Sequence, residues 1–369
     1  MKPFSYLITG WAMMTAALSL GSCAQMDTDL AECPSGLDVT FKYDYNIQRA
    51  DMFKDHVGGI SLYAFDENNQ LVLHKDTANT ALTAPLQQNN FTWHISESEL
   101  PVGRYRIAAL AYQKDYNETL ATPGAKLRQA ELNPGDDITK LQVTLDREAT
   151  DAMSATAWVD HKGCPLDTLW ATRNLTADDD WVTIKPQKVS QHQISLLRDT
   201  KQVNITLRQT VNPSDMNDAD YDVKVYDTNG RLLYNNEPDA TDTRLCYTPY
   251  AQWTTTLGTR AEDETAHLMH TAHYELMINR LVAHQNNEAD ARLLITNKRT
   301  GKEVANVNLP ALLADGRRAY ERYNYSAQEY LDREYQFALD FYLVGDKWQY
   351  ISVSIAALSW SYRVQNVEL

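Results

Sequence analysis

Apolar and polar residues alternate strictly along several stretches of this chain. In residues 37–46, apolar side chains fall on one side and polar ones on the other: Val39, Phe41, Tyr43 and Tyr45 against Asp38, Thr40, Lys42 and Asp44. A period of two predicts a half-buried strand. The same pattern predicts strands at 59–65, 71–74, 91–95, 105–112, 138–145, 274–282, 337–343, 351–355 and 358–369. Helical stretches are few, with short turns predicted at 51–56 and 96–100, so the chain is predicted to be all-β.

An internal repeat predicts two domains. Residues 203–212 match residues 37–46 in register, and a similar hairpin sequence follows each copy, at 62–71 and at 223–232. In these hairpins Asp66 and Asp227 are expected to accept hydrogen bonds from the turn, and Asn69 and Gly230 to adopt the left-handed conformation that closes it. We therefore expect tandem β domains at 35–148 and 190–369. The connection at 149–189 is either a linker or the first strands of the second domain.

The charge of the chain excludes some classes of partner. Its 369 residues are enough for two domains and hold 34 Lys and Arg against 49 Asp and Glu, a formal net charge of −15. Such a chain repels phosphate backbones and anionic lipids. Neither a nucleic-acid-binding protein nor a basic protein of the membrane surface is expected.

The first 22 residues have the composition of an export signal. Lys2 is followed by an apolar stretch at 4–20, interrupted by small polar residues, and no acidic residue occurs before Asp27. The sequence Leu20-Gly21-Ser22-Cys23 resembles the lipobox of bacterial lipoproteins. This resemblance implies cleavage between Ser22 and Cys23, and a Cys23 that carries diacylglycerol as a thioether and a further acyl chain on its amine. Two or more chains hold a protein stably on a membrane. The alternative is an ordinary secretory signal followed by a chance cysteine.

A short acidic tether follows Cys23. Residues 23–34 contain Asp27, Asp29 and Glu32, and they resemble the signal that sends Bacteroidetes lipoproteins to the outer face of the outer membrane. With Cys23 lipidated, three cysteines remain: Cys33, Cys164 and Cys246. At most one disulfide can form within the chain, and the sequence does not select among the three pairs.

Two clusters of polar residues could in principle hold a metal. Five oxygen-bearing side chains fall within eight residues: Asp215, Asn217, Asp218, Asp220 and Asp222. They have the ligand density of a calcium site, but they fail the EF-hand spacing, so a solvated loop is the preferred interpretation. His267, His270 and His273 would share one face of a helix, whereas on a strand they disperse, and we expect surface histidines. No metal and no cofactor are predicted.

Neither do the motifs of common enzymes occur. The chain has no H-E-x-x-H, G-x-S-x-G, P-loop or G-x-G-x-x-G sequence. Its aromatic residues could form a platform on which sugars stack. Trp158, Trp170 and Trp181 are the best exposed candidates for it, because they lie in the less patterned connection.

The two ends of the mature chain resemble a known family. The residues concerned are Cys33-Pro34, the strand at 37–45, Asn46, Asp51-x-Phe53, Val57, Leu62-Tyr63-x-Phe65-Asp66 and the closing stretch at 360–369. They are similar to the FimB/Mfa2 family of Bacteroidetes fimbrial anchoring subunits. The resemblance implies two tandem transthyretin-like Greek-key β-sandwiches, on a lipoprotein that fastens fimbriae to the outer membrane and limits their length. It implies Cys23 as the lipid site and no catalytic residue.

The bond between Arg49 and Ala50 is interpreted differently from a bond that is cut in the wider superfamily. Shaft subunits of that superfamily are cut after an arginine near the N-terminus, and Arg49-Ala50 could be such a bond. A cut there would separate the body of the protein from its lipid, so Arg49 is interpreted as structural.

The leading hypothesis is a non-enzymatic anchor that binds a fimbrial shaft subunit by strand addition. The candidate surfaces are an edge groove and the C-terminal strand, with contact residues Tyr362, Val364, Val367 and Leu369. A different class of function is a surface glycan-binding lipoprotein of a polysaccharide-uptake system. A third is a lipid-anchored hydrolase, which requires clustered carboxylates in a cleft.

Overall fold

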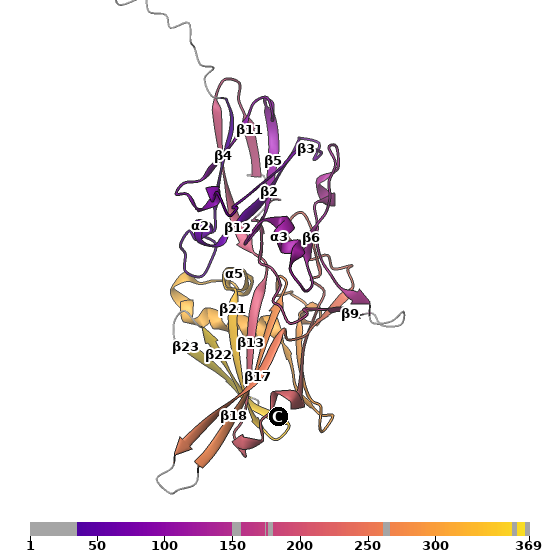
Figure 1. Ribbon diagram of the computed structural model, residues 1–369, viewed down its shortest axis with the longest axis vertical. Coiled ribbons are helices and arrows are strands. Elements are labelled where there is room, and N and C mark those ends of the chain that lie inside the picture. The colour runs from indigo at the N-terminus through magenta and orange to yellow at the C-terminus, as the bar shows by residue number, and fades with distance from the viewer. Residues whose placement is uncertain are drawn as a thin grey trace, which may run out of the picture.

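Two β-sandwiches lie end to end in the computed structural model, which describes residues 35–149, 156–173, 175, 180–260, 266–355 and 360–365 (Figure 1). We call them the N-terminal and the C-terminal sandwich. Of the described residues, 47% lie in strands and 16% in helices, which confirms the all-β prediction. Within the described residues, no helix has both the length and the apolar character needed to cross a membrane.

The N-terminal sandwich is built on one path of strands, ordered β3-β2-β5-β10-β12-β1-β4, with β11 also paired to β5. Its strands are β1 (Gly36–Lys42), β2 (Gly59–Phe65), β3 (Leu71–Ala78), β4 (Thr92–Ser96), β5 (Gly103–Tyr112), β10 (Leu169–Thr172), β11 (Trp181–Ile184) and β12 (Val189–Arg198). The helical turns are α2 (Phe53–His56), η1 (Pro85–Gln87) and α3 (Tyr116–Ala121). Alternate residues of β1 and β2, among them Val39 and Leu62, enclose one apolar core together with Ile107 and Trp170.

A small sheet covers the other face of β2 and β5. It consists of β6 (Leu127–Gln129), β7 (Val143–Leu145) and β15 (Arg231–Leu232), and η2 (Ile138–Lys140) precedes β7. Tyr63 and Leu110 pack against Leu127 and Val143 in a second core that continues into the C-terminal sandwich. Because β2 is covered on both faces, all seven of its residues are buried.

Two six-stranded sheets form the C-terminal sandwich. One is ordered β17-β18-β13-β21-β22-β23, with β13 (Lys201–Gln209), β17 (Ala251–Arg260), β18 (Ala266–Ile278), β21 (Gln336–Val344), β22 (Lys347–Ile355) and β23 (Trp360–Gln365). The other is ordered β20-β19-β14-β16-β9-β8, with β8 (Glu148–Ala149), β9 (Thr156–Val159), β14 (Tyr221–Asp227), β16 (Arg244–Tyr247), β19 (Arg292–Asn297) and β20 (Glu303–Asn308). We call the first the C-terminal sheet.

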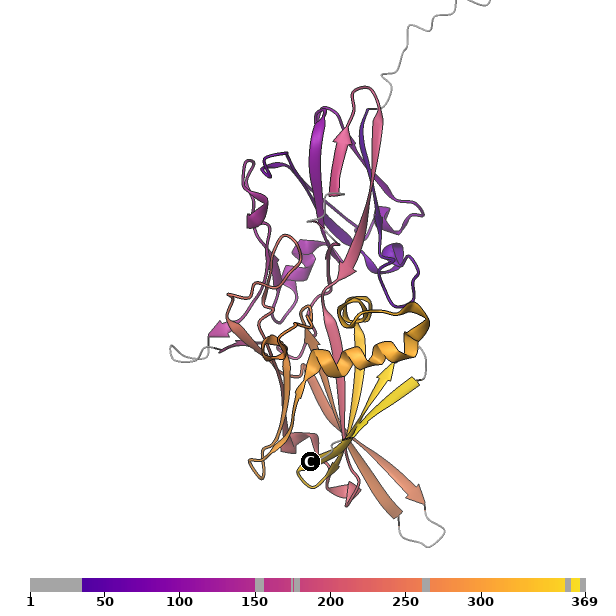
Figure 2. The same cartoon turned by 180° about the vertical axis from the view of Figure 1, so that it is seen from behind.

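Short helices close the sandwich. They are η4 (Pro213–Asp215), η5 (Asp218–Asp220), η6 (Asn287–Ala289), α4 (Leu309–Ala314), η7 (Asp315–Tyr323) and α5 (Ala327–Arg333). Figure 2 shows α4 and η7 crossing the sheet near β21, β22 and β23.

The repeat identifies equivalent strands. β1 pairs with β12 in parallel and with β4 antiparallel, and β13 pairs with β21 in parallel and with β18 antiparallel. The first hairpin turn forms as expected, because Asp66 accepts hydrogen bonds from the backbone N–H groups of Asn68 and Gln70, and Asn69 has a φ of 60°.

The expected second hairpin does not form. β15 leaves β14 and pairs with β7 instead. Gly230 is not among the residues with positive φ, and a Cβ there would meet Leu245 Cδ1 at 2.6 Å. A larger residue at this position would have to displace the end of the Leu245 side chain, and no left-handed turn is formed.

Strand pairing also corrects the expected domain boundaries. The segment 149–189 is not a plain connection, since β9 joins the C-terminal sandwich while β10 and β11 join the N-terminal one. β12 pairs with β1, so the second sandwich begins after Arg198 and not at residue 190. The predicted strand at 138–145 is reduced to η2 and β7, whereas the short turn predicted at 96–100 forms at 97–100. Alternation predicts that a strand exists, but it does not show which sheet the strand joins.

Candidate functional site

The C-terminal sheet has two open edges. β17 and β23 stand at the two ends of its strand order, and within the described residues each pairs with one neighbour. An edge strand presents unpaired N–H and C=O groups on one side, where another chain can add a strand. The two edges are therefore candidate contact surfaces for an extended segment of another protein.

β23 contains two of the four predicted contact residues. Tyr362 pairs with Val353 and Val364 with Ile351 along β22, and both partners on β22 are buried. The other two, Val367 and Leu369, lie outside the described residues. The segment thus folds as an edge strand of its own sheet.

A helical layer supports this edge. α4 begins after Asn308, whose side chain accepts a hydrogen bond from the backbone N–H of Ala311, and α5 begins after Ser326, whose side chain accepts from Glu329. η7 contacts both β22 and β23. The layer is anchored by buried apolar residues: Leu309, Leu313, Tyr320, Tyr330 and Leu331.

β17 and β18 form a long hairpin at the other edge, which we call the distal ribbon (251–260 and 266–278). Figures 1 and 2 show it projecting from the end of the molecule that lies farthest from β1. β18 pairs with β13 only through Ala272–Ile278, so the outer half of the ribbon pairs only with itself. The ribbon is the less supported of the two edges.

The chain enters the structure at the opposite pole. β1 begins at Gly36, at the far end of the N-terminal sandwich. Ser22 and Cys23, the predicted cleavage and lipidation residues, lie outside the described residues. β1 itself is flanked by β12 and β4 and pairs with both.

Arg49 lies between the two sandwiches. Its Nη1 donates a hydrogen bond to Tyr325 OH at 3.5 Å, and its guanidinium group lies 4.4 Å from the centre of the Tyr323 ring. These contacts agree with the structural role expected of Arg49.

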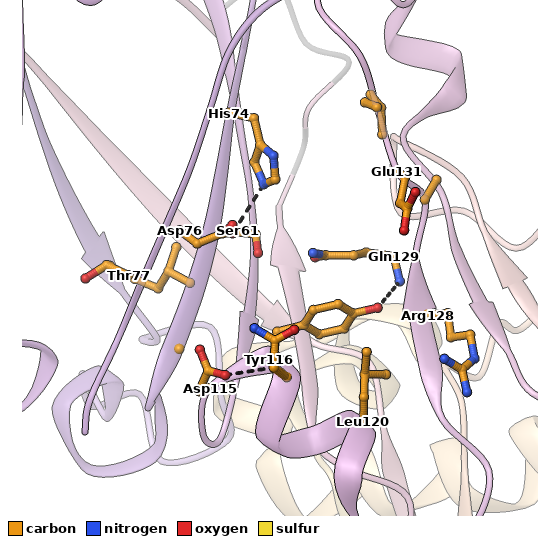
Figure 3. A pocket seen from close by; sticks show the side chains of 15 residues that line it. Ser61, His74, Asp76, Thr77, Asp115, Tyr116, Leu120, Arg128, Gln129 and Glu131 are labelled. Carbon is orange, nitrogen blue, oxygen red and sulfur yellow. Dashed lines mark hydrogen bonds and ion pairs between the residues drawn. The ribbon is translucent and has the colours of Figure 1, made fainter. Parts of the chain in front are cut away.

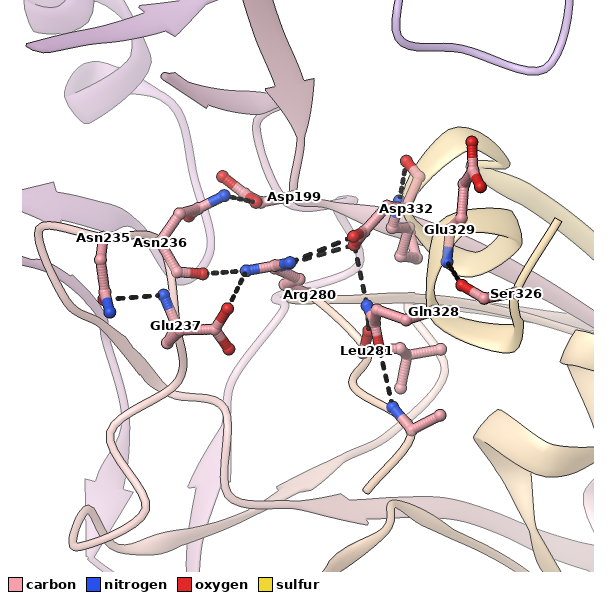
Figure 4. Close-up of polar contacts among 12 residues, drawn as sticks. Asp199, Asn235, Asn236, Glu237, Arg280, Leu281, Ser326, Gln328, Glu329 and Asp332 are labelled. Atoms are coloured by element: carbon pink, nitrogen blue, oxygen red, sulfur yellow. Dashed lines mark hydrogen bonds and ion pairs between the residues drawn. The ribbon is translucent and has the colours of Figure 1, made fainter. Parts of the chain in front are cut away.

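The junction between the sandwiches contains a buried ion pair (Figure 4). Arg280 Nε donates to Asp332 Oδ1 and Nη2 donates to Oδ2, both at 3.1 Å. Gln328 Nε2 donates to Asp332 Oδ1 at 2.9 Å, and Lys201 Nζ donates to the backbone oxygen of Asp332 at 3.0 Å. Arg280 also donates to the backbone oxygen of Asn236. Both charges are thus paired and hydrogen-bonded, as buried charges must be.

Two further groups of the junction have strongly altered pKa values. Asp199 lies between β12 and β13, is fully buried, and accepts a hydrogen bond from Asn236 Nδ2 at 2.8 Å. Burial raises the pKa of Asp199 to about 7 and lowers the pKa of Lys201 to about 8, because both charged forms lose hydration. We call Asp199, Lys201, Arg280 and Asp332 the junction cluster.

Arginine and tyrosine side chains stack across the same junction. The ring of Tyr45 lies between the guanidinium groups of Arg173, at 3.8 Å, and Arg333, at 4.0 Å. Arg333 also lies 5.1 Å from the centre of the Tyr325 ring and donates to the backbone oxygen of Asn46 at 3.5 Å. Cation–π contacts of this kind attach one sandwich to the other.

A polar pocket of about 410 Å³ opens beside β3, α3 and β6. Figure 3 shows Tyr116 between a side formed by His74 and Asp76 and a side formed by Gln129 and Glu131. His74 Nε2 lies 3.2 Å from Asp76 Oδ1, and the backbone N–H of Gln129 donates to Tyr116 OH at 3.0 Å. The pocket offers several hydrogen-bonding groups around one aromatic ring.

The acidic cluster is divided among separate partners. Asp218 accepts from Thr254 Oγ1 at 2.7 Å, Asp222 pairs with Lys224 Nζ at 2.5 Å, and the side chain of Asn217 caps η5. Across the described residues, no group of three or more His, Cys, Asp or Glu side chains is arranged to hold a metal ion.

The histidines disperse along β18, as a strand requires. His270 pairs with Thr256, and His273 pairs with Trp253, on whose ring it stacks at 5.1 Å between centroids. Cys164 and Cys246 are free, and Cys33 lies outside the described residues.

The three tryptophans considered for a sugar-stacking platform lie on separate strands, Trp158 on β9, Trp170 on β10 and Trp181 on β11. Trp170 is fully buried in the N-terminal core, so its choice as an exposed candidate was wrong. The ring of Trp181 has Arg104 and Arg106 within 4.7 Å, and Lys224 lies 5.0 Å from the ring of Trp158. Trp253, on the distal ribbon, is 40% exposed, and the sequence patterns did not single it out.

These features define an all-β protein of two sandwiches, with open sheet edges in its C-terminal half. The model of the Fimbrillin-A associated anchor proteins Mfa1 and Mfa2 matches residues 30–366, and the chain belongs to this family. No curated protein matches the chain.

Solved structures share the fold. A "putative adhesin" from Bacteroides thetaiotaomicron is 24% identical over 91% of this chain and 100% of its own, with a TM-score of 0.70. A "putative polysaccharide binding" protein from the same organism is 27% identical over 90% and 99%, with a TM-score of 0.66. The fimbrial anchor protein Mfa2 from Porphyromonas gingivalis is 17% identical over 89% and 99%, with a TM-score of 0.57.

Proposed function

We propose that this protein is an outer-membrane lipoprotein that anchors fimbriae to the cell surface and limits their length. Cys23 carries the lipid after removal of the signal at 1–22, and two tandem transthyretin-like sandwiches follow. A fimbrial shaft subunit binds by β-strand complementation. The fimbrial role is supported by membership of the anchor family.

The main support for this proposal is that β1 and the distal ribbon lie at opposite ends of the molecule. The chain enters at one pole with β1, and the distal ribbon of the C-terminal sheet projects at the other. A lipid at the entry pole leaves the ribbon pointing away from the membrane. A fimbria bound at that end is held by main-chain hydrogen bonds and by covalent lipid in series.

Replacing the lipid site tests the anchor. In Cys23→Ala cells we expect fimbriae to be shed into the medium, as measured by immunoblotting of cell and medium fractions and by electron microscopy. Cys164→Ala is the matched control, because Cys164 is free and partly exposed, and its fimbriae should stay on the cells. Fimbriae that remain attached to Cys23→Ala cells would show that the proposal is wrong.

The C-terminal version of strand complementation has its own test. If the C-terminal strand supplies the contact, a chain lacking residues 362–369 loses binding to purified shaft subunit in a pull-down while its circular dichroism spectrum is retained. If both folding and binding survive the deletion, this segment does not supply the contact.

A second candidate function, glycan binding, is favoured by the pocket of Figure 3. Asp76, Gln129 and Glu131 can hydrogen-bond sugar hydroxyls around the ring of Tyr116. Affinity electrophoresis on several glycans tests it, with Gln129→Ala expected to abolish any retardation. A wild-type protein that no glycan retards would exclude it.

A further inference from the structure

Exposed apolar side chains gather around the distal ribbon. The described residues include nine large apolar side chains that are exposed. Four lie on the ribbon: Trp253, Leu257, Leu268 and Met269. Two more lie beside the ribbon's sheet neighbours: Val211 follows β13, and Val344 is the last residue of β21. Six of the nine are thus concentrated at one pole, and concentrations of this kind mark contact surfaces.

The register places the most exposed of these side chains on the outer face. Leu257, 59% exposed, pairs with Met269, and Trp253 pairs with His273. Residues of the opposite parity enter the core in the inner half of the ribbon, as Tyr274 does, while Leu268 in the outer half is 46% exposed. Trp253, Leu257 and Met269 form an outer stripe that is partly open to solvent, with His273 stacked on the ring of Trp253.

No other described strand pairs with the outer half of the ribbon, although Thr271 at its inner limit is buried and accepts a hydrogen bond from Arg208 Nη1 at 3.3 Å. Residues 255–260 and 266–271 pair only with each other. An isolated two-stranded ribbon is marginally stable in water, even when it is rich in threonine as this one is. A third strand would complete it.

β17 lacks the features that usually protect an edge strand. It contains no proline, its register with β18 has no bulge, and its first charged residue is Arg260 at its end. Protective edges carry charges, prolines or bulges. Residues 251–260 and 266–274 contain no Asp or Glu, although the whole chain has 49. The carboxylates against these two strands lie at the inner end of the ribbon, where Glu275 pairs with Ala251 and Asp218 accepts hydrogen bonds from Gln252 and Thr254.

We propose that the free edge of β17 is where a fimbrial subunit adds an extended strand, with its alternate apolar side chains packed on Trp253 and Leu257. This inference rests on the proposed function and names its contact surface. The occupant is indicated by the position of β1, which begins at the opposite pole from the ribbon. Twelve residues, 23–34, separate Cys23 from the described part of the chain and can span at most about 40 Å, so a lipid on Cys23 leaves the ribbon facing away from the membrane and toward the fimbria.

The test uses the lipidated full-length protein in detergent and fimbriae sheared from wild-type cells. We expect Leu257→Asp to raise the apparent Kd for fimbriae at least tenfold. Leu82→Asp is the matched control, because Leu82 is 94% exposed in a loop of the N-terminal sandwich, and it should change the Kd less than twofold. Equal denaturation midpoints show that both variants are folded.

Hydrogen exchange gives a second measurement that does not depend on a variant. Bound fimbriae should slow the exchange of the amides in 251–260 at least tenfold and leave those in 360–365 unchanged. Protection of 360–365 alone would move the contact to β23 and overturn the inference.

The remaining outcomes separate the inference from the proposed function. If the wild-type protein binds no fimbriae, the anchor function itself is wrong. If it binds but Leu257→Asp behaves as the control does, only the β17 surface is wrong. If sedimentation shows wild-type dimers that Leu257→Asp dissociates, the occupant is a second copy of this chain and not a fimbrial subunit.

Discussion

Two regions of the molecule depart from the usual placement of side chains, in opposite ways. One is the junction between the two sandwiches, and the other is the distal ribbon. The junction buries charges, since the side chains of Arg280 and Asp332 are each 8% exposed. The ribbon exposes apolar groups, with Leu257 at 59%. Buried charges and clustered exposed apolar residues both cost free energy unless they have partners.

The difference lies in where the partners are. At the junction they belong to the same chain, because Asp332 is satisfied by Arg280 and Gln328, and Arg333 by Tyr45. At the ribbon, no described residue covers Leu257. The junction is therefore a permanent part of the fold, whereas the ribbon is the surface that we propose for another molecule.

The largest effect should come from breaking the ion pair of the junction. Asp332→Ala leaves Arg280 buried without its counterion, and removing one partner of such a pair costs about 3–5 kcal/mol. Urea denaturation followed by tryptophan fluorescence measures this loss. Asp222→Ala is the control, because the pair of Asp222 with Lys224 is more exposed and should contribute less than about 1 kcal/mol. Equal losses in the two variants would show that the junction is no different from the surface.

The pH dependence of stability should report the junction next. Because burial raises the pKa of Asp199 to about 7, the folded protein binds this proton more tightly than the unfolded chain does. The stabilisation is complete below about pH 4 and is lost as the pH rises through 7, with a slope of at most about 1.4 kcal/mol per pH unit.

Asp199→Asn should flatten the slope, and Asp55→Asn, at an exposed position, should leave it unchanged. Lys201 contributes in the opposite sense at higher pH, because its pKa is lowered to about 8 and its cost disappears as the pH rises above that value. Thermal denaturation at pH 5, 6, 7 and 8 measures the effect of Asp199, and measurements continued to about pH 10 report that of Lys201. If the slope is unchanged in Asp199→Asn, the pH dependence comes from another group. Asp227 is one such group, because burial also raises its pKa to about 7.

A smaller loss is expected from the stacked arginines. Arg333→Ala removes the cation–π contacts to Tyr45 and Tyr325 and should cost about 1–2 kcal/mol. The matched control is Arg244→Ala, since Arg244 stacks on Tyr226 within the C-terminal sandwich, away from the junction. Limited proteolysis should cut Arg333→Ala faster between the sandwiches and leave Arg244→Ala unchanged there. If both variants are cut alike, the stacked arginines do not hold the junction.

Alternation in the sequence predicted the strands that have one buried face. β1 and β21 were expected close to their observed ranges, and so was the turn closed by Asp66. Of the strands covered on both faces, β2 was predicted at its observed bounds, whereas β10 was missed. β10 has four buried residues in a row, and it fell inside the expected connection. α4 and α5, with six and seven residues, are too short to show a helical period.

The candidate site was predictable only in part, for a physical reason. A strand at the end of the chain could be expected to be an edge, and β23 is one. That β17 is also an edge depends on which strands pair elsewhere, and this is a property of the whole sheet. The sequence gives only a weak indication of the junction cluster. Asp199 and Lys201 lie between two alternating stretches, and Arg280 follows an apolar stretch. Their burial depends on contacts between segments that are far apart in the sequence.

The smallest change in the free energy of unfolding is expected for a substitution on the distal ribbon. Leu257→Asp should alter the free energy of unfolding by less than about 0.5 kcal/mol, because the side chain is mostly in water and makes no core contact to lose. Urea denaturation in the absence of fimbriae measures it, beside Leu339→Ala, a buried neighbour in the same sheet that should cost about 2–5 kcal/mol. A large loss for Leu257→Asp would mean that the ribbon is stabilised from within the chain. In that case the exposed stripe belongs to the fold, and the contrast with the junction disappears.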